Sequence, residues 1–453
     1  MILEKFRCDR ASSTLFLSIC AAGFLMRLAC TTGLIGSDDL AYAHFARLIA
    51  NFQYAPESIH YALRYGLTIP QAIIYRLFGI HEWTTFVLPL LASAASVPLL
   101  MIVGARLVGP RAALFAGILL ASFTVSLRYA TILVPEPVAG FYILLAVLLY
   151  LESDSRRPLV LGASAGLILG LAYLTKESAA FVGVAVFLDA VLRRKWAAAC
   201  AMAGGAMAIV AIEHAYYLAA TGDLLYRMHA MKVHEQSAMV LGANRNLNYR
   251  LFKSYPRMML FPSWDFGVHS IFAAIAALSL FRWRPPRGQL LLLWTAVPLL
   301  YLNFGSSSLT HFTALPVADR YVEFIYVPLF VLVGAVLDHN MELRPWTAGP
   351  MLACVAIVVS VGLWCGYVTR QSGWRIHDVA ILRQIADNAN QKQIKTVRFV
   401  GDSDDRWKDE MSILAPRLQI TIASAEADLV IGPDAMGLPS SVSISGTSEK
   451  SLR

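Results

Sequence analysis

Long apolar segments separated by short polar connections make up most of the first 370 residues of the chain. A helix needs about 20 mostly apolar residues to cross the hydrocarbon core of a bilayer. Segments of this kind lie near residues 14–35, 83–107, 112–130, 134–151, 159–175, 177–192, 196–219, 267–282, 289–305, 321–337 and 347–368. The pattern predicts an all-α polytopic membrane domain over residues 1–370, with about eleven transmembrane helices.

The connection over residues 36–82 is long and has a helical pattern of its own. Apolar residues from Phe45 to Phe52 recur at helical spacing, with less apolar residues on the opposite face. Thr68 and Pro70 begin a second short apolar helix, which Gly79 ends. We expect two helices that lie in the membrane interface. The alternative is a surface loop that only rests on the membrane.

Residues 371–453 have the pattern of a separate small domain. Strand-like segments lie at 397–400, 418–423 and 428–431, and helix-like segments at 376–389 and near 405–415. We predict a small extracytoplasmic, or periplasmic, α/β domain with little apolar mass of its own, which packs on the membrane domain. Acceptor docking is one interpretation of its role.

Composition and charge agree with a membrane protein and give it an orientation. Of 453 residues, 57% are hydrophobic and only 15% are charged, values outside the range of soluble proteins. Basic residues gather in alternate short connections, at Lys5, Arg7 and Arg10, at Arg106 and Arg111, at Arg156 and Arg157, at Arg193 to Lys195, and at Arg282 to Arg287. The positive-inside rule then predicts a multi-pass protein of the cell inner (plasma) membrane, with a cytoplasmic N-terminus and an extracytoplasmic C-terminus. The net charge of +8 follows from this orientation, so we expect membrane lipids and no nucleic acid as partners.

Ser37, Asp38 and Asp39 come directly after the first apolar segment, without a neighbouring base. Carboxylates at a membrane boundary lose hydration energy, so they usually have a partner or a task. In one interpretation Ser37 caps a helix and the two acids lie in its first turn, where the helix dipole favours them. In the other, an ionised carboxylate acts as a general base. The two interpretations are compatible.

Further polar residues lie at the predicted outer ends of other segments. Arg128 ends one span, and Glu136 begins the next between two prolines. Lys176 and Glu177 are adjacent, and such neighbours often pair with each other. Arg320 precedes a late span, either as an anchoring residue or as part of a phosphate-binding site.

The connection over residues 220–266 is basic. Arg250, Lys253 and Arg257 have the spacing of one helical face and suit a lipid phosphate, or anionic lipids in general. The pair His229 and His234 has the wrong spacing for a usual metal site, so we assign no metal ligands. No glycine-rich phosphate loop is evident, and Asp402-Ser403-Asp404 reads as a polar turn rather than a nucleotide-sugar motif.

Several short motifs occur in a fixed order on these predicted faces. They are Gly36-Ser37-Asp38-Asp39 with Tyr42 and Ala46, Leu77-Phe78-Gly79, Gly104-Ala105-Arg106-Leu107-Val108-Gly109 with Arg111-Ala112-Ala113, Arg128-Tyr129 with Glu136, Tyr173-Leu174-Thr175-Lys176-Glu177, and Asp319-Arg320-Tyr321 ahead of Pro328. The order resembles that of the GT-C class of polytopic glycosyltransferases, in the branch of the protein O-mannosyltransferases and aminoarabinose lipid A transferases (glycosyltransferase family 39). The resemblance covers residues 14–340.

The resemblance implies a GT-C fold and an inverting transfer of a sugar from a polyprenyl-phosphate donor to an acceptor hydroxyl at the extracytoplasmic face. Asp38 matches the leading acid of the family's first-loop motif and would take the acceptor proton. The expected ligands of the donor phosphate are Arg128, Lys176, Arg250, Lys253, Arg257 and Arg320. No cofactor is required, and a divalent cation remains an open alternative. The acceptor is a glycan, a lipid or a protein.

Three positions depart from the family pattern. Asp39 stands where the family usually has Glu, and Glu136 where it often has Asp. Arg64-Tyr65-Gly66 lies where a His-Pro-Pro sequence is usual. We therefore expect acceptor recognition to differ, with Arg64, Tyr65 and Glu177 as further site candidates beside the catalytic candidates Asp38, Asp39 and Glu136.

Two other functions fit a polytopic chain. A transporter or lipid-linked glycan flippase would place ionisable residues near the middle of the membrane, often in two related halves. Here the charges lie at the outer boundary and no internal repeat is visible. A polymerase or ligase that uses a lipid-pyrophosphate donor is the third interpretation.

Overall fold

A computed structural model provides the three-dimensional structure of the chain. It describes residues 10–154, 157–231, 248–260, 266, 269–279, 287–306, 315, 317–343, 346 and 348–369, and then 383, 386–387, 396–399, 413–414, 419–421 and 429–431. The helices expected at 376–389 and near 405–415, and Asp402-Ser403-Asp404, lie wholly or largely outside these residues.

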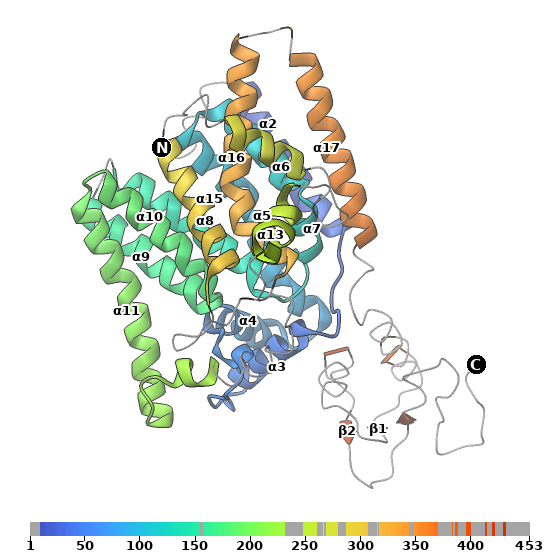
Figure 1. The fold of residues 1–453 in the computed structure, drawn as a ribbon. Helices are drawn as coiled ribbons and strands as arrows, with labels where there is room; N and C mark the ends of the chain where they lie inside the picture. Colours follow the sequence, from blue (N-terminus) through green and yellow to red (C-terminus); the bar gives the residue numbers. More distant parts are fainter. Residues whose placement is uncertain are drawn as a thin grey trace.

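Seven helices in the described residues are long and apolar enough to cross a membrane. They are α2 (Arg10–Ala29), α5 (Glu82–Leu107), α8 (Pro135–Glu152), α9 (Pro158–Thr175), α11 (Trp196–Thr221), α16 (Glu323–Leu343, which 3-10 helix η5, Asp319–Val322, precedes) and α17 (Ala348–Thr369). Shorter helices are α6 (Pro110–Ala121), α10 (Ala180–Leu192), α14 (His269–Ser279) and α15 (Gly288–Phe304). The prediction of a mostly helical, polytopic architecture is confirmed, whereas the number eleven stays a prediction. Helix α16 runs through the middle of the bundle, and α17 stands at its side (Figure 1).

The span expected over residues 112–130 is interrupted. Helix α6 ends at Ala121, and α7 (Thr124–Tyr129) begins after Phe123, whose ψ of 120° is extended. The Phe123 ring packs against Tyr326, with ring centroids 4.7 Å apart, so aromatic packing accompanies the break. The break lets α7 carry Arg128 and Tyr129 to the start of α16.

Helices α9 and α11 approach each other closely through small residues. A Cβ added at Gly166 would lie 2.0 Å from the carbonyl oxygen of Met202, and one added at Gly205 would lie 2.2 Å from that of Ala163. Only glycine permits such backbone contact, which is a common basis of helix association in membranes. The pairing fixes the end of α9, and Lys176 and Glu177 follow directly.

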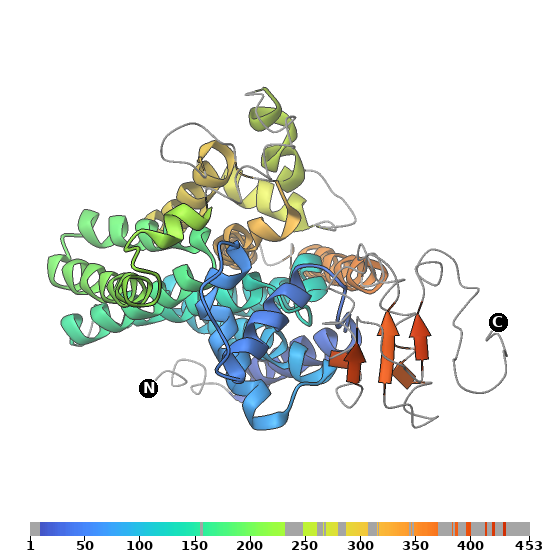
Figure 2. The ribbon, with the colours of Figure 1, turned by 90° about the horizontal axis from the view of Figure 1, so that it is seen from below.

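Helices α3 (Asp38–Ala50) and α4 (Tyr65–Phe78), with the short η1 (His60–Leu63) between them, cover one end of the bundle (Figures 1 and 2). We call this the loop end and the opposite one the far end. Phe45 of the expected apolar face of α3 is 4% exposed, but Leu48 and Ile49 are only half-buried and Phe52 is 80% exposed, whereas Ala43 on the opposite face is buried. The side of α3 turned to protein therefore differs from the expected apolar face. On α4, by contrast, Ile69, Ile73 and Leu77 are exposed in a stripe at every fourth residue. Of the two helices, α4 therefore offers the face suited to lipid.

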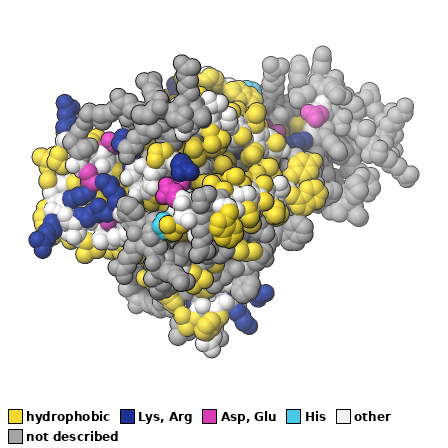
Figure 3. All heavy atoms as spheres, turned by 90° about the horizontal axis from the view of Figure 1, so that it is seen from above, with side chains coloured by type: hydrophobic (Ala, Val, Ile, Leu, Met, Phe, Trp, Pro, Cys, Tyr) yellow, Lys and Arg dark blue, Asp and Glu magenta, His cyan; other side chains and the backbone are white. Residues whose placement is uncertain are grey.

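Basic side chains gather toward one side of the far end (Figure 3). The connections there include Arg193, Arg194 and Lys195 between α10 and α11. Lys195 pairs with Asp154, and Arg287 lies 3.0 Å from the same carboxylate. Which side of the membrane this end faces stays a prediction.

Among the residues described after α17, three short strands occur. They are β1 (Thr396–Phe399), β2 (Gln419–Thr421) and β3 (Leu429–Ile431), and they form a parallel sheet in the order β2-β1-β3. Val397 pairs with Ile420 on one side and with Leu429 on the other. The strands agree with the expected pattern, and the α/β domain and its boundary at residue 371 stay predictions.

Candidate functional site

The turn before α3 is built around Asp39. Gly33 and Gly36 have φ values of +70° and +72°, which favour glycine. The side chain of Asp39 is fully buried, and its two oxygens accept the backbone N–H groups of Ile35 and Ser37, each at 2.7 Å. Ser37 is the N-cap residue of α3 and the two acids lie in its first turn, as expected, but the Ser37 hydroxyl makes no cap hydrogen bond. The family usually has the longer Glu at this position, but the shorter side chain of Asp39 is sufficient to close this turn.

Asp38 points in a different direction and meets polar side chains. The Tyr61 hydroxyl donates to Oδ1 at 2.8 Å, and Nη2 of Arg320 donates to Oδ2 at 2.5 Å. The side chain keeps 22% of its surface exposed. Burial acts to raise the pKa of Asp38, but Arg320 and Tyr61 outweigh it and hold that pKa below its usual value. For Asp39, in contrast, burial raises the pKa.

Glu136 joins the same group from the first turn of α8. Its side chain is 1% exposed, and Oε1 pairs with Nζ of Lys176 and lies 3.3 Å from Nε of Arg320. Nζ of Lys176 also lies 3.6 Å from the ring centre of Tyr321. Asp38, Glu136, Lys176 and Arg320 thus form one cluster of two carboxylates and two cations, which we call the outer charge cluster. The other oxygen of Glu136, Oε2, is buried and has no hydrogen-bond partner among the described residues.

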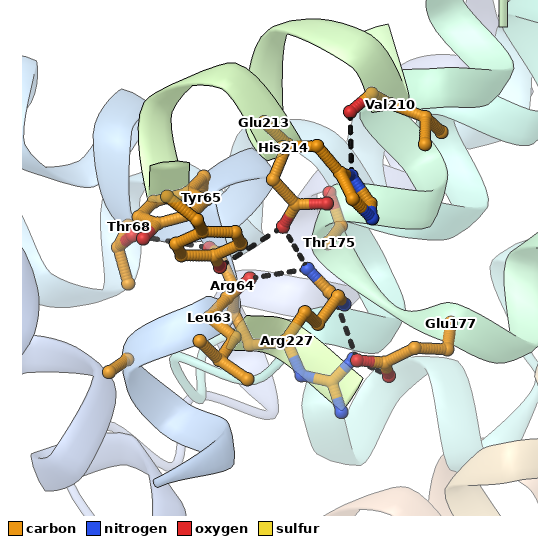
Figure 4. Close-up of polar contacts among 12 residues, drawn as sticks. Leu63, Arg64, Tyr65, Thr68, Thr175, Glu177, Val210, Glu213, His214 and Arg227 are labelled. Carbon is orange, nitrogen blue, oxygen red and sulfur yellow. Dashed lines mark hydrogen bonds and ion pairs between the residues drawn. The ribbon is translucent and has the colours of Figure 1, made fainter. Parts of the chain in front are cut away.

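Glu177 does not pair with Lys176, so that interpretation of the dipeptide is wrong. It binds Arg64 and lies 2.6 Å from Nη2 of Arg227, as Figure 4 shows. Arg227 also pairs with Glu213 and donates to the carbonyl oxygen of Leu63 at 3.1 Å. We call Arg64, Glu177, Glu213 and Arg227 the inner charge network. Arg227 and Glu213 were not among the predicted site residues, although a lone carboxylate inside the apolar segment 196–219 is a usable signal.

Two further candidates lie near these clusters. Nη1 of Arg128 is 3.4 Å from Asp319, and the Tyr129 hydroxyl donates to the same carboxylate at 3.1 Å. Asp319 immediately precedes Arg320, so α7 braces the segment that carries Arg320. The Tyr65 hydroxyl bonds that of Tyr54 at 2.9 Å, outside the outer charge cluster.

The predicted basic face over residues 250–257 is not formed by one helix. The π-helix η4 (Tyr249–Lys253) ends at Ser254, where α13 (Tyr255–Leu260) begins. Arg250 is 3% exposed and donates to the carbonyl oxygens of Leu302 and Leu315, whereas Lys253 and Arg257 are exposed. The guanidinium of Arg250 therefore binds backbone carbonyl oxygens and is not exposed toward a lipid phosphate.

No group of three His, Cys, Asp or Glu side chains suited to a metal ion occurs among the residues that the structure describes. His229 bonds Asp223 at 2.6 Å, and His234 lies outside them. Both carboxylates of the outer charge cluster face cationic side chains.

Comparisons with known proteins agree with this architecture. Residues 69–217 match the family model described as dolichyl-phosphate-mannose-protein mannosyltransferase. The fold is similar to that of apo ArnT from Cupriavidus metallidurans, with a TM-score of 0.54 and 14% identity over 91% of this chain and 86% of that one. A search of curated protein sequences gives no match.

A second similar fold is the archaeal oligosaccharyltransferase AglB from Archaeoglobus fulgidus. Its structure with an inhibitory peptide and a dolichol-phosphate has a TM-score of 0.50 and 13% identity, over 90% of this chain and 64% of that one. The apo form of the oligosaccharyltransferase from the same organism has a TM-score of 0.54 and 11% identity, over 94% and 66%. The chain thus spans just under two thirds of the archaeal proteins. The family match and the shared fold support, for this chain, the GT-C class of polytopic membrane glycosyltransferases.

Proposed function

We propose that this protein transfers a sugar from a polyprenyl-phosphate donor to an acceptor hydroxyl at the loop end, which faces the extracytoplasmic side of the inner membrane. The observation that carries the proposal is the outer charge cluster, in which the partly exposed carboxylate of Asp38 lies beside two cations. A carboxylate and cations are the two groups that this chemistry needs. The family match and the AglB structure with dolichol-phosphate support a lipid-linked donor.

Asp38 is the proposed general base. The acceptor oxygen attacks the anomeric carbon from the face opposite the phosphate, the bond between that carbon and the phosphate oxygen breaks, and its electron pair stays on the phosphate. The acceptor proton moves to Asp38, and the configuration at the anomeric carbon inverts. The low pKa of Asp38 keeps the carboxylate ionised at neutral pH, as a base requires. Asp39 has both oxygens engaged by backbone N–H groups, so we assign it a positioning role.

Lys176 and Arg320 are the proposed ligands of the leaving phosphate. Each is held by Glu136, so the two cations are fixed before the donor binds and need not reorganise during the reaction. The free Oε2 of Glu136 is a buried acceptor in need of a donor, which a sugar or acceptor hydroxyl can supply. Arg128 supports Arg320 through Asp319, while Lys253 and Arg257 suit the headgroup region of the donor or of other anionic lipids.

The buried charge of Arg27 in the membrane gives little support to the alternative function, a transporter or flippase. Arg27 is fully buried within α2, but it donates to Ser93 at 2.7 Å, to Ser126 at 3.0 Å and to the carbonyl oxygen of Gly23 at 2.9 Å. A guanidinium satisfied in this way holds helices together.

Purified protein in liposomes, supplied with a polyprenyl-phosphate sugar and candidate acceptors, tests the proposal. Wild-type protein should form the glycosylated acceptor with inverted configuration, and Asp38→Asn should form it at least about a hundredfold more slowly. Equal turnover by both proteins would remove Asp38 as the base. Lipid translocation without any glycosyl product would favour the flippase.

A further inference from the structure

Described residues from the chain after α17, which we call the C-terminal part, lie at the turn over residues 33–37 that precedes Asp38. Helix α17 ends beside the end of α2, since a Cβ added at Gly366 would lie 3.6 Å from Sγ of Cys30. The chain therefore leaves its last described span next to the turn over residues 33–37. The strands β1 and β2 lie to the side of α3 in both ribbon views (Figures 1 and 2).

One contact between the two parts is an ion pair. Arg383 donates through Nε to Oε1 and Oε2 of Glu82, at 3.1 and 3.3 Å, and through Nη2 as well. This fork-shaped contact is the geometry in which a guanidinium binds a carboxylate most specifically. Both side chains keep about a third of their surface exposed, so the pair lies at the rim of the contact.

The ion pair lies against the Asp38 turn. A Cβ added at Gly33 would lie 3.0 Å from Oε1 of Glu82 and 3.3 Å from Nη2 of Arg383. The turn is thus held on one side by this pair and on the other by Asp39, while Thr131 accepts the N–H of Thr32 at 2.8 Å.

A second contact is apolar. Ile413 is 3% exposed and belongs to one cluster of buried apolar residues with Leu34 and Leu40. These two leucines precede and follow Asp38 in the sequence. The same cluster includes Leu133 and Val138, which precede and follow Glu136 in the sequence. A residue from the C-terminal part therefore belongs to the same buried apolar cluster as close sequence neighbours of both carboxylates of the outer charge cluster.

We propose that the C-terminal part is a positioning element for the active site, in which Arg383 and Ile413 hold the turn before α3 and thereby fix Asp38 relative to Glu136. The proposal rests on the proposed function for its kinetic consequence, but the docking itself does not. Because an error of about 1 Å in the placement of a catalytic group costs up to about a hundredfold in rate, a loosened turn should act on kcat.

Docking is tested without any activity assay. In a background in which the six native cysteines are replaced, Ile413→Cys and Asp387→Cys report a buried and an exposed position of the same part of the chain. We expect a membrane-impermeant maleimide to label Ile413→Cys at least about tenfold more slowly than Asp387→Cys, because the side chain is buried. Arg383→Gln should raise the rate at residue 413 about threefold and leave that at residue 387 unchanged. Equal labelling of the two positions in the parent background would overturn the proposal.

Kinetics then test positioning. Arg383→Gln and Glu82→Gln should each lower kcat about tenfold with little change in the KM for the donor lipid. Arg383→Lys should recover part of the loss, and the exchange Glu82→Arg with Arg383→Glu should recover more than either single change. Unchanged kcat in Arg383→Gln, together with unchanged labelling at residue 413, would overturn the proposal. A wild-type protein that transfers no sugar would refute the proposed function, while the labelling would still decide the docking.

Discussion

Arg320 binds Asp38 and, through a different nitrogen, faces Glu136. Nη2 lies 2.5 Å from Oδ2 of Asp38, and Nε lies 3.3 Å from Oε1 of Glu136. A guanidinium has donors in a rigid fork, so one side chain can serve two carboxylates that come from different helices. The base candidate and the phosphate-binding candidates are therefore fixed relative to each other by one residue.

Exchanging each acid of the Asp38-Asp39 pair for its amide should separate catalysis from structure. Asp38→Asn should lower kcat by about 10²–10⁴, the usual effect of losing a general base, and leave the melting temperature nearly unchanged. Asp39→Asn should lower the melting temperature, because one backbone N–H of the turn would face an amide NH₂ in place of an acceptor. Turnover in liposomes and thermal unfolding in detergent measure the two effects. A large loss of kcat in Asp39→Asn, with the lower melting temperature in Asp38→Asn instead, would make Asp39 the base.

Tyr61→Phe should change the pH dependence of the reaction. Burial and Arg320 have the largest effects on the pKa of Asp38, and the hydrogen bond from the Tyr61 hydroxyl also lowers it. Without this bond the pKa rises, so the acid limb of kcat/KM should move to higher pH, by about half a unit to one unit for a bond of about 1 kcal/mol. Activity at neutral pH should change little, because Asp38 stays ionised there.

Tyr54→Phe is the matched control for this change. Its hydroxyl bonds the carbonyl oxygen of Ala62 and the hydroxyl of Tyr65, away from Asp38. The acid limb should be that of the wild type. An unshifted limb in Tyr61→Phe as well would mean that a group other than Asp38 titrates.

Local patterns gave the helical architecture but not the partners of the charged residues. The apolar length of the spans follows from the sequence, because a bilayer imposes it on each segment separately. The partner of Lys176 is Glu136, 40 residues away, while its neighbour Glu177 turns to Arg64 and Arg227. Such a choice depends on how α8, α9 and the loop end pack together, and spacing along the chain does not contain it.

The break after Ala121 and the basic segment around Arg250 have similar explanations. An apolar run from 112 to 130 gives no sign that Phe123 packs against Tyr326 and interrupts the helix. In the basic segment, a helical repeat predicted one face, but the helix breaks at Ser254, whose hydroxyl donates to Asn303 at 2.7 Å. In both cases a tertiary contact overrides the local preference of the backbone.

Lys176→Met should weaken binding and departure of the donor phosphate. Loss of one preorganised cation typically costs about 10²–10³ in rate, so kcat/KM for the donor lipid should fall by this order. Lys195→Met removes a lysine of the same type at the far end, where it pairs with Asp154. This control should keep wild-type kcat/KM. Equal, small effects of both changes would indicate that Lys176 serves only to neutralise Glu136.

Arg227 and Glu213 offer a test of the inner charge network by a double-mutant cycle. Their side chains are 4% and 1% exposed, so removal of either charge leaves the other buried without a full partner. Arg227→Met and Glu213→Met should each destabilise the protein by about 3–5 kcal/mol, while the double variant should lose much less than the sum of the two. Chemical unfolding in detergent, with Arg111→Met as an exposed control, measures this coupling. Strict additivity would show that the two residues stabilise the fold independently, and that Glu177 and Leu63 supply the contacts of Arg227 that matter.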